Sequence, residues 1–289
     1  MSLADGRSIG LYGGTGTGKT TLIGEYAKWL KMAKGKTLLY HSSDMGGFDS
    51  IIPHVKLGLI TANEFVHGIE DPWNYIHDAV QGKGLTDDIG AVAFDSAQSM
   101  GEALLNYITK SPWKVGQQNT QKFSVNRVGS SGNASDALTV GLNNEAHYGM
   151  VQTFMLDEIW ASTWLVRKGI DVIWTFGEWR GESVTDAPVI GPAIVGKALT
   201  PKIPRWLKYT LRTVSIPVEN QTDRHLLQLV PQPEMSGIAM AMANARWPEG
   251  SSTPCPAFIE PASLVGFFDL HDQAARESED ALRAEVGEV

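Results

Sequence analysis

The residues with the clearest chemical potential lie near the amino terminus, in the stretch GGTGTGKTT at positions 13–21. The stretch fits the pattern G-x-x-x-x-G-K-[ST], in which main-chain N–H groups turn inward around phosphate groups. Lys19 is then expected to reach the β- and γ-phosphates, and the hydroxyl of Thr20 to bind Mg²⁺. The alternative is a glycine-rich turn with a surface lysine. The residues expected to hold ATP are Gly13, Gly14, Thr15, Gly16, Thr17, Gly18, Lys19, Thr20 and Thr21.

A carboxylate that could help to hold the magnesium ion ends an apolar run further along the chain. Asp95 closes the run IGAVAFD, which has the composition of a buried strand. Because the carboxyl ends of parallel strands meet at one edge of a sheet, we expect Asp95 beside the phosphate loop, with Thr20 as the second protein ligand of the metal. The alternative is that Asp95 forms a turn or caps the helix that follows.

ATP hydrolysis also needs a group that orients the attacking water. Asp44 follows the apolar run LLYHSS and is the candidate base, with His41, Ser42 and Ser43 as polar neighbours. We expect this second strand to end near the phosphate-loop strand. An aspartate that opens a glycine-rich turn is the alternative for Asp44. Glu178 ends the run IDVIWTFGE and is a candidate sensor of the γ-phosphate or the metal, or else a solvated strand end.

These residues need a scaffold, and the hydrophobic pattern predicts one. Residues 8–12 form an apolar run before the loop, and residues 21–33 carry apolar side chains at helical spacing before Gly35. Further strands are predicted at 36–43, 88–96, 170–178, 207–219 and 224–232, with helices at 148–169 and 262–286. Apolar strands that alternate with helices are typical of a parallel sheet covered on both faces. We therefore expect an α/β fold with a mostly parallel, twisted central sheet, followed by a C-terminal hairpin and helix.

Two domain-level features follow from composition. Residues 1–250 are predicted to form the core, and residues 251–289 a C-terminal extension. Within the core, residues 114–144 are rich in Gln, Asn, Ser and Gly, which predicts a mobile insertion. This insertion is a candidate single-stranded DNA contact, although a linker or a subunit-contact arm explains its composition equally. The residues that could contact phosphates or bases are Trp113, Lys114, Lys122, Phe123 and Arg127.

Aromatic residues elsewhere are predicted to be structural. Met155, Trp160 and Trp164 recur at helical spacing, so we expect them in the core rather than on an aromatic binding platform.

Composition and charge exclude several classes of protein. The 289 residues contain one cysteine, so an internal disulfide is excluded, and no cysteine and histidine spacing fits structural zinc. The formal charge of −8 argues against a surface that grips phosphate backbones everywhere. A local basic lining, or simply a solvated basic face, is expected from Arg180, Lys197, Lys202, Arg205, Lys208 and Arg212. With no secretory leader and no membrane-length apolar run, we expect a cytoplasmic protein that does not enter membranes.

Several stretches together resemble a known family. GGTGTGKTT, LLYHSSDMGG, AVAFDS, the run from His147 to Glu178 and GPAIVGKALTPKIPRWL are similar, in order and spacing, to the RecA-core ATPases carried by phages, above all those linked to single-strand annealing and recombination. The resemblance spans residues 8–247 and is most specific at the phosphate loop and Asp95. It implies a RecA-like sheet with ATP and Mg²⁺ at its carboxyl edge. It also implies a homo-oligomeric ring or filament, nucleotide between subunits, single-stranded DNA as partner, a single-strand-binding protein as a further partner, and the host cytoplasm as location.

The resemblance also suggests roles for individual residues. Asp44 falls where RecA-like proteins usually carry a catalytic glutamate, and its shorter side chain predicts slow hydrolysis. Arg246 matches a Lys-x-Arg position at which Asn244 replaces the lysine. Arg246 is therefore a candidate finger toward the γ-phosphate of a neighbouring subunit, with Lys197 as competitor, and both have the alternative of being surface cations.

Three functions are compatible with these features. The first is an ATP-dependent recombination or strand-annealing protein that acts as an oligomer on single-stranded DNA. The second is a nucleotide-gated assembly or DNA-packaging ATPase with a protein partner, which the acidic charge balance favours slightly. The third is a small-molecule kinase, which ranks last because the sequence has no arginine-rich lid segment.

Overall fold

The computed structural model describes residues 6–43, 48–64, 71–110, 145–182, 187–195, 202–219, 221–234 and 239–287. The strands are β1 (Ser8–Tyr12), β2 (Thr37–Ser42), β3 (Ile60–Glu64), β4 (Ile89–Asp95), β5 (Asp171–Glu182), β6 (Pro188–Ala193), β7 (Tyr209–Ile216), β8 (Arg224–Gln228), β9 (Gln232–Pro233), β10 (Met240–Ala241) and β11 (Phe258–Ile259). The helices are α1 (Lys19–Lys34), α2 (Ile52–Lys56), α3 (Pro72–Val80), α4 (Ala97–Lys110), α5 (Glu145–Ala161), α6 (Thr163–Arg167), α7 (Ile203–Trp206) and α8 (Leu264–Val286).

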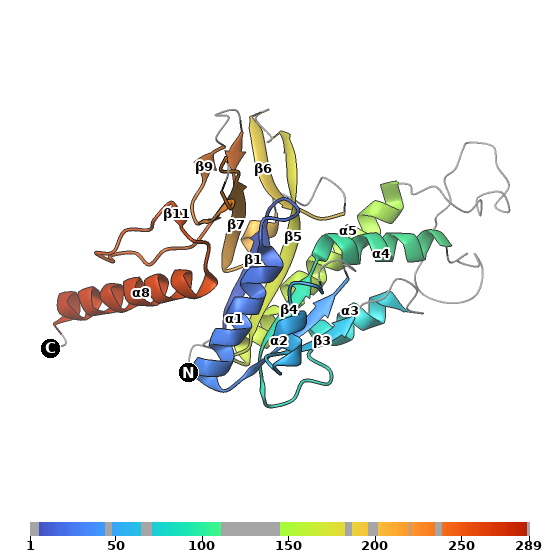
Figure 1. Ribbon diagram of the computed structural model, residues 1–289, viewed down its shortest axis with the longest axis horizontal. Coiled ribbons are helices and arrows are strands. Elements are labelled where there is room, and N and C mark those ends of the chain that lie inside the picture. Colours follow the sequence, from blue (N-terminus) through green and yellow to red (C-terminus); the bar gives the residue numbers. More distant parts are fainter. Residues whose placement is uncertain are drawn as a thin grey trace.

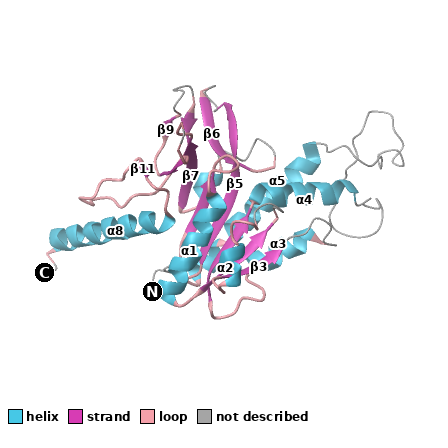
Figure 2. Ribbon diagram, in the orientation of Figure 1, coloured by secondary structure: helices cyan, strands magenta, loops and turns pink. Residues whose placement is uncertain are grey.

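A mixed, mostly parallel sheet runs through the molecule in the order β11-β8-β7-β1-β5-β4-β2-β3 (Figures 1 and 2). The strands from β7 to β3 are parallel, whereas β8 and β11 are antiparallel to their neighbours. The predicted α/β fold of RecA-like type is confirmed. The expected position of the second strand, β2, near the phosphate-loop strand β1 was wrong, because β5 and β4 lie between them.

The long strand β5 extends beyond the central sheet and pairs with β6 in a second, smaller sheet. β10 pairs with β6 and with β9 in the same small sheet. The sequence pattern did not predict this second sheet, because its other strands are short and only partly buried. Because β5 continues into this small sheet, it leaves the central sheet just after Thr175, whose hydroxyl contacts Asp95.

Helices cover both faces of the central sheet, as the fully apolar strands require. One face carries α1 and α8, and the other carries α3, α4 and α5 (Figure 1). Side chains alternate along β1, where Ile9 and Leu11 face α1 and Tyr12 belongs to the opposite cluster. This alternation decides which strand-end residues can meet at a common site.

The terminal helix α8 begins at Ser263, whose hydroxyl caps it by accepting from the Gly266 N–H at 3.0 Å. Its first turns bury Phe267 and Phe268 in the same cluster as α1. Arg7 fixes this contact because its guanidinium lies 4.0 Å from the centroid of the Phe268 ring and pairs with Asp272 at 2.6 Å. The later turns extend away from the sheet (Figure 1).

The helix expected at 148–169 divides into α5 and α6 around Ser162. The buried Ser162 hydroxyl donates to the Ile159 carbonyl at 2.6 Å and accepts from the Trp174 indole N–H at 3.2 Å. Met155 is buried as predicted, but the expected core position of the other two aromatic residues was wrong. Trp160 is 58% exposed and Trp164 is 49% exposed. They lie on the outer face of these helices, which helical periodicity alone did not distinguish from the inner one.

No helix in the described ranges has the length and apolarity needed to cross a membrane.

Candidate functional site

The phosphate loop connects β1 to α1 and depends on glycine at specific places. A Cβ atom on Gly13 would lie 2.4 Å from the carbonyl oxygen of Thr213 on β7, so no other residue fits there without moving the backbone. Gly18 is the N-cap of α1 and has a φ of 91°, a left-handed conformation that favours glycine. The loop can therefore run close to β7 and still open its N–H groups at the helix N-terminus.

Side chains of the loop are held by the loop itself. The Lys19 ammonium donates to the carbonyls of Gly13 and Gly14, both at 2.9 Å. The Thr17 hydroxyl donates to the Gly14 carbonyl at 2.8 Å and shares a hydrogen bond of 2.7 Å with the Thr213 hydroxyl. Lys19 is thus folded over the loop, where phosphate oxygens can replace the two carbonyls as its partners.

Asp95 reaches the start of α1 from the end of β4. Its Oδ2 atom accepts from the Thr20 hydroxyl at 2.8 Å and from the Tyr40 hydroxyl at 2.6 Å, and its Oδ1 atom accepts from the Thr175 hydroxyl. Asp95 is buried, with only 5% of its surface exposed. Three hydroxyl groups therefore orient this carboxylate toward the loop.

Sequence reasoning named Thr20 and Asp95 but missed Tyr40 and Thr175. Both missed residues carry a hydroxyl and have apolar neighbours in a buried part of their strand. That signal is visible in the sequence. The face of the sheet on which each hydroxyl lies depends on strand register, and the register could not be read from the sequence.

The residues fit a nucleotide with Mg²⁺. Magnesium favours oxygen ligands, keeps several waters and is usually bound by one or two protein groups together with substrate phosphates. The Thr20 hydroxyl and the Asp95 carboxylate supply such oxygens next to the loop. Among the described residues there is no group of three or more His, Cys, Asp or Glu that could cage a metal by itself. The donor set is therefore that of a metal bound together with phosphates.

Comparison with known proteins agrees with this geometry. A family model described as an AAA domain matches residues 4–138, which contain the loop and Asp95. No curated protein matches the chain.

The chain is also similar to solved structures. A KaiC-like protein from Pyrococcus horikoshii OT3 is similar, with 14% identity, 78% of each chain covered and a TM-score of 0.42. The flagellar accessory protein FlaH from Methanocaldococcus jannaschii is also similar, with 12% identity, 78% of each chain covered and a TM-score of 0.40.

Glu178 lies on the other face of the central sheet. It follows Trp174 and Phe176 at alternate positions of β5, whereas Thr175 faces Asp95. Glu178 Oε2 accepts from Nε and Nη2 of Arg212 at 3.0 and 2.9 Å, and its Oε1 accepts from Arg180. These contacts place Glu178 in an ion pair within the sheet rather than at a solvated strand end, and its catalytic role stays a prediction.

The residue that follows β2 hydrogen-bonds to the turn that carries Asp95. Asp44 lies outside the described residues. The Ser43 N–H donates to the Asp95 carbonyl at 2.8 Å, and the Ser43 hydroxyl donates to the Ser96 carbonyl at 3.1 Å. Ser96 in turn caps α4, because its hydroxyl accepts from the Ser99 N–H at 3.2 Å. These bonds tie the end of β2 to the turn that carries Asp95, whose peptide bond to Ser96 is cis.

His41 is turned away from the loop. Its ring stacks on Phe94 with centroids 5.3 Å apart, and its Nδ1 atom lies 3.0 Å from the Tyr75 hydroxyl of α3. Burial lowers the pKa of His41 to about 4, so the ring is neutral at physiological pH. This position indicates a packing role rather than a partner of the attacking water.

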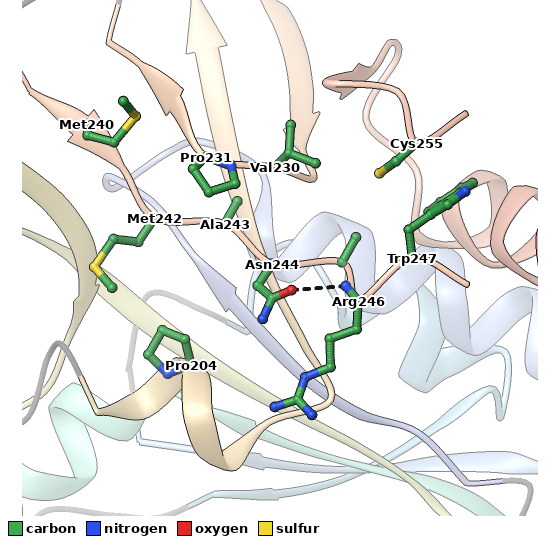
Figure 3. Close-up of a pocket in the computed structure, with 11 residues that line it drawn as sticks. Pro204, Val230, Pro231, Met240, Met242, Ala243, Asn244, Arg246, Trp247 and Cys255 are labelled. Atoms are coloured by element: carbon green, nitrogen blue, oxygen red, sulfur yellow. Dashed lines mark hydrogen bonds between the residues drawn. The ribbon is translucent and has the colours of Figure 1, made fainter. Parts of the chain in front are cut away.

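Arg246 lies at the opposite edge of the sheet from the loop. Asn244 pairs with Thr210 near the start of β7, and the Arg246 guanidinium contacts the Arg205 carbonyl at 3.4 Å. The Asn244 side chain accepts from the Arg246 N–H at 3.0 Å and supports a φ of 44°, which non-glycine residues seldom adopt (Figure 3). Exposed Arg246 therefore cannot serve the loop of its own chain. Its competitor Lys197 lies outside the described residues.

A cavity of about 400 Å³ adjoins Arg246. Its wall is mostly apolar and belongs to the segments around β10 and the end of β8 (Figure 3). The lining residues include Pro204, Val230, Met240, Met242, Trp247 and Cys255. No residue of the phosphate loop is among those that line this cavity.

Proposed function

We propose that the protein binds ATP with Mg²⁺ at the carboxyl edge of its central sheet and hydrolyses it slowly. The observation that carries this proposal is the 2.8 Å contact between the Thr20 hydroxyl and Asp95 Oδ2, directly beside a complete phosphate loop. When bound there, Mg²⁺ would neutralise charge on the phosphates during their transfer to water.

The chain's own residues have separable tasks in this proposal. Main-chain N–H groups of residues 13–21 hold the phosphates, and Lys19 leaves its two carbonyl partners to contact the outer phosphates. Asp95 keeps its negative charge toward the metal because its three partners are neutral hydroxyl groups. Asp44 remains the candidate group that orients water.

At a finer level, we propose that the protein acts in phage-type DNA recombination or single-strand annealing, as a homo-oligomer on single-stranded DNA. The order of its motifs supports this proposal. Exposed Trp160 and Trp164 also support it, since base stacking on aromatic rings is typical of single-strand binding. Arg167 and Lys168 follow them, and the Lys168 ammonium lies 5.1 Å from the centroid of the Trp164 ring. Cations beside exposed rings suit a single strand with its phosphates.

The alternative is a nucleotide-gated assembly or DNA-packaging ATPase with a protein partner. The projecting end of α8 favours it, because Leu282 there is 61% exposed. The net charge of −8 points in the same direction.

Binding to labelled single-stranded oligonucleotides separates the two functions. We expect anisotropy to rise in a salt-dependent manner with ATP and Mg²⁺, and the double variant Trp160→Ala/Trp164→Ala to bind at least about 10-fold more weakly. Trp206→Ala, at another partly exposed tryptophan, is the matched control and should bind normally. If the wild-type protein binds no oligonucleotide at any salt concentration, the DNA function is wrong and the protein-partner alternative takes its place.

A further inference from the structure

His225 has a buried ring nitrogen that lacks a partner beside the phosphate loop. Its Nδ1 atom is one of the few buried side-chain atoms in the described ranges that make no hydrogen bond. A Cβ atom built on Gly18 would lie 3.9 Å from this nitrogen, so the imidazole faces the N-cap of α1. Buried polar groups without partners are uncommon in proteins and call for an explanation, such as a ligand that is bound there in the working protein.

The sheet places His225 on the opposite flank of the loop from Asp95. β8 is separated from β1 by β7, and β4 is separated from β1 by β5, so the two residues lie two strands away on either side. The side chains of His225 and Asp95 both face α1. Leu227 and Leu229, which alternate with His225, belong to the cluster that α1 covers, and Asp95 contacts Thr20 of α1. If Thr20 and Asp95 mark the end with the metal and the outer phosphates, the inner phosphate and nucleoside extend toward β7 and β8.

The main chain holds His225 firmly in this place. Its carbonyl accepts from the Ala262 N–H at 2.8 Å, and it is paired in register with Ser215 of β7. The neighbouring Arg224 forms an ion pair with Glu260. The imidazole is thus supported from β7 and from the segment before α8, as a side chain that orients a ligand needs to be.

We propose that His225 contacts the nucleoside end of the bound nucleotide, with its imidazole donating a hydrogen bond to a hydroxyl oxygen of the ribose. This rests on the proposed ATP binding at the loop. His225 therefore distinguishes a nucleotide from an inorganic polyphosphate, which the loop and Lys19 alone do not.

Three ligands test this role in equilibrium binding with Mg²⁺: ATP, 2′-deoxyATP and inorganic tripolyphosphate. We expect His225→Ala to bind ATP about 3- to 10-fold more weakly, which is the scale of one hydrogen bond. Its affinity for tripolyphosphate should stay within about 2-fold of wild type, since that ligand lacks the ribose that His225 contacts. If the ribose 2′-hydroxyl is the partner, the variant loses no affinity for 2′-deoxyATP; if the 3′-hydroxyl is, the loss equals that for ATP.

Two outcomes would overturn the proposal. Equal weakening of ATP and tripolyphosphate would mean that His225 only supports the loop, and unchanged ATP binding would mean that it contacts nothing. His54→Ala is the matched control, because His54 also has an unpartnered Nδ1 atom and packs against α1, but at Gly24 rather than at the loop. It should bind all three ligands normally. If the wild-type protein binds neither ATP nor tripolyphosphate, the proposed function fails, and the role of His225 falls with it.

Discussion

Asp95 is buried among neutral donors, and this decides what it can do. Hydroxyl groups of Thr20, Tyr40 and Thr175 fix the orientation of the carboxylate without cancelling its charge. An arginine or lysine partner at this place would have formed an ion pair and left less charge for a metal. The arrangement favours a carboxylate that is ready for a cation, although the Tyr40 and Thr175 contacts had to be found in the structure.

Removing the charge of Asp95 should therefore affect turnover more than folding. We predict that Asp95→Asn lowers the rate of ATP hydrolysis by roughly 100-fold or more, the scale of removing one preorganised electrostatic group. Thr175→Val, which removes a hydroxyl donor and keeps the carboxylate, should have a smaller effect. Steady-state phosphate release with melting curves as folding controls measures both. Normal turnover in Asp95→Asn would remove this residue from the metal site.

Burial of His41 makes the free energy of unfolding depend on pH. Its pKa falls from the ordinary 6.5 to about 4 because the ring is buried. The unfolded chain therefore takes up a proton at a higher pH than the folded chain does. The stability that comes from neutral His41 is complete above about pH 6.5 and declines as the pH falls toward 4, by up to about 3 kcal/mol.

Urea unfolding at pH 7.5 and pH 5 tests this behaviour. We expect wild-type protein to lose stability between the two values and His41→Gln, which has no titrating ring, to lose clearly less. Tyr75 faces the same ring, and burial raises its pKa to about 12, so it does not titrate in this range. Identical losses in both proteins would show that other groups cause the acid dependence.

At the scale of elements, an ion pair joins β5 to β7 across the end of β1. Arg212 contributes a side chain that is 8% exposed, and Glu178 one that is 13% exposed. Buried pairs of this kind add little net stability against apolar residues. Removing Arg212 would leave Glu178 with the more exposed Arg180 as its charged partner. The sequence showed Arg212 as part of a cationic stretch and gave no indication that it points inward.

We predict that Arg212→Met lowers the free energy of unfolding by about 1–3 kcal/mol and that the double variant Glu178→Gln/Arg212→Met regains much of the loss. The exposed pair of Arg224 and Glu260 is the control, since Arg224→Ala should lower the free energy of unfolding far less than Arg212→Met does. Urea titrations measure all of these variants. A stable Glu178→Gln protein that has lost all ATP turnover would instead favour the catalytic role of Glu178.

The elements around the site were predictable to a large extent, and for a clear reason. The runs 8–12, 36–43 and 88–96 are apolar because both faces of their strands are covered, and this signal is local. Strand order, register and the exposure of Trp160 and Trp164 depend on contacts between distant segments. Sequence periodicity therefore predicted that α5 and α6 are helical but not which side of them faces solvent.

At the scale of the whole molecule, the position of Arg246 bears on whether two copies of the chain could share a site. Arg246 is exposed and stands at the edge of the sheet away from its own loop. A function for its guanidinium in hydrolysis is therefore possible only toward a second copy, in a head-to-tail ring or filament. This role for Arg246 stays a proposal.

Mixing two inactive proteins tests it. We predict that Asp44→Asn and Arg246→Ala each lose turnover alone, and that mixing them restores up to about a quarter of wild-type activity by forming composite sites with both residues intact. Arg205→Ala is the control for a neighbouring surface cation. An absence of recovery at every mixing ratio, in particles shown by light scattering to be oligomers, would contradict action between subunits.

The most direct test of the whole account is an equilibrium titration of ATP into the wild-type protein and Lys19→Ala, with Mg²⁺ and with EDTA. The account predicts tight binding only by wild-type protein with Mg²⁺, at least about 10-fold weaker binding in EDTA, and about 100-fold weaker binding by a folded Lys19→Ala protein. Equal affinity of the two proteins for ATP would show that the nucleotide binds elsewhere, and would contradict the central claim.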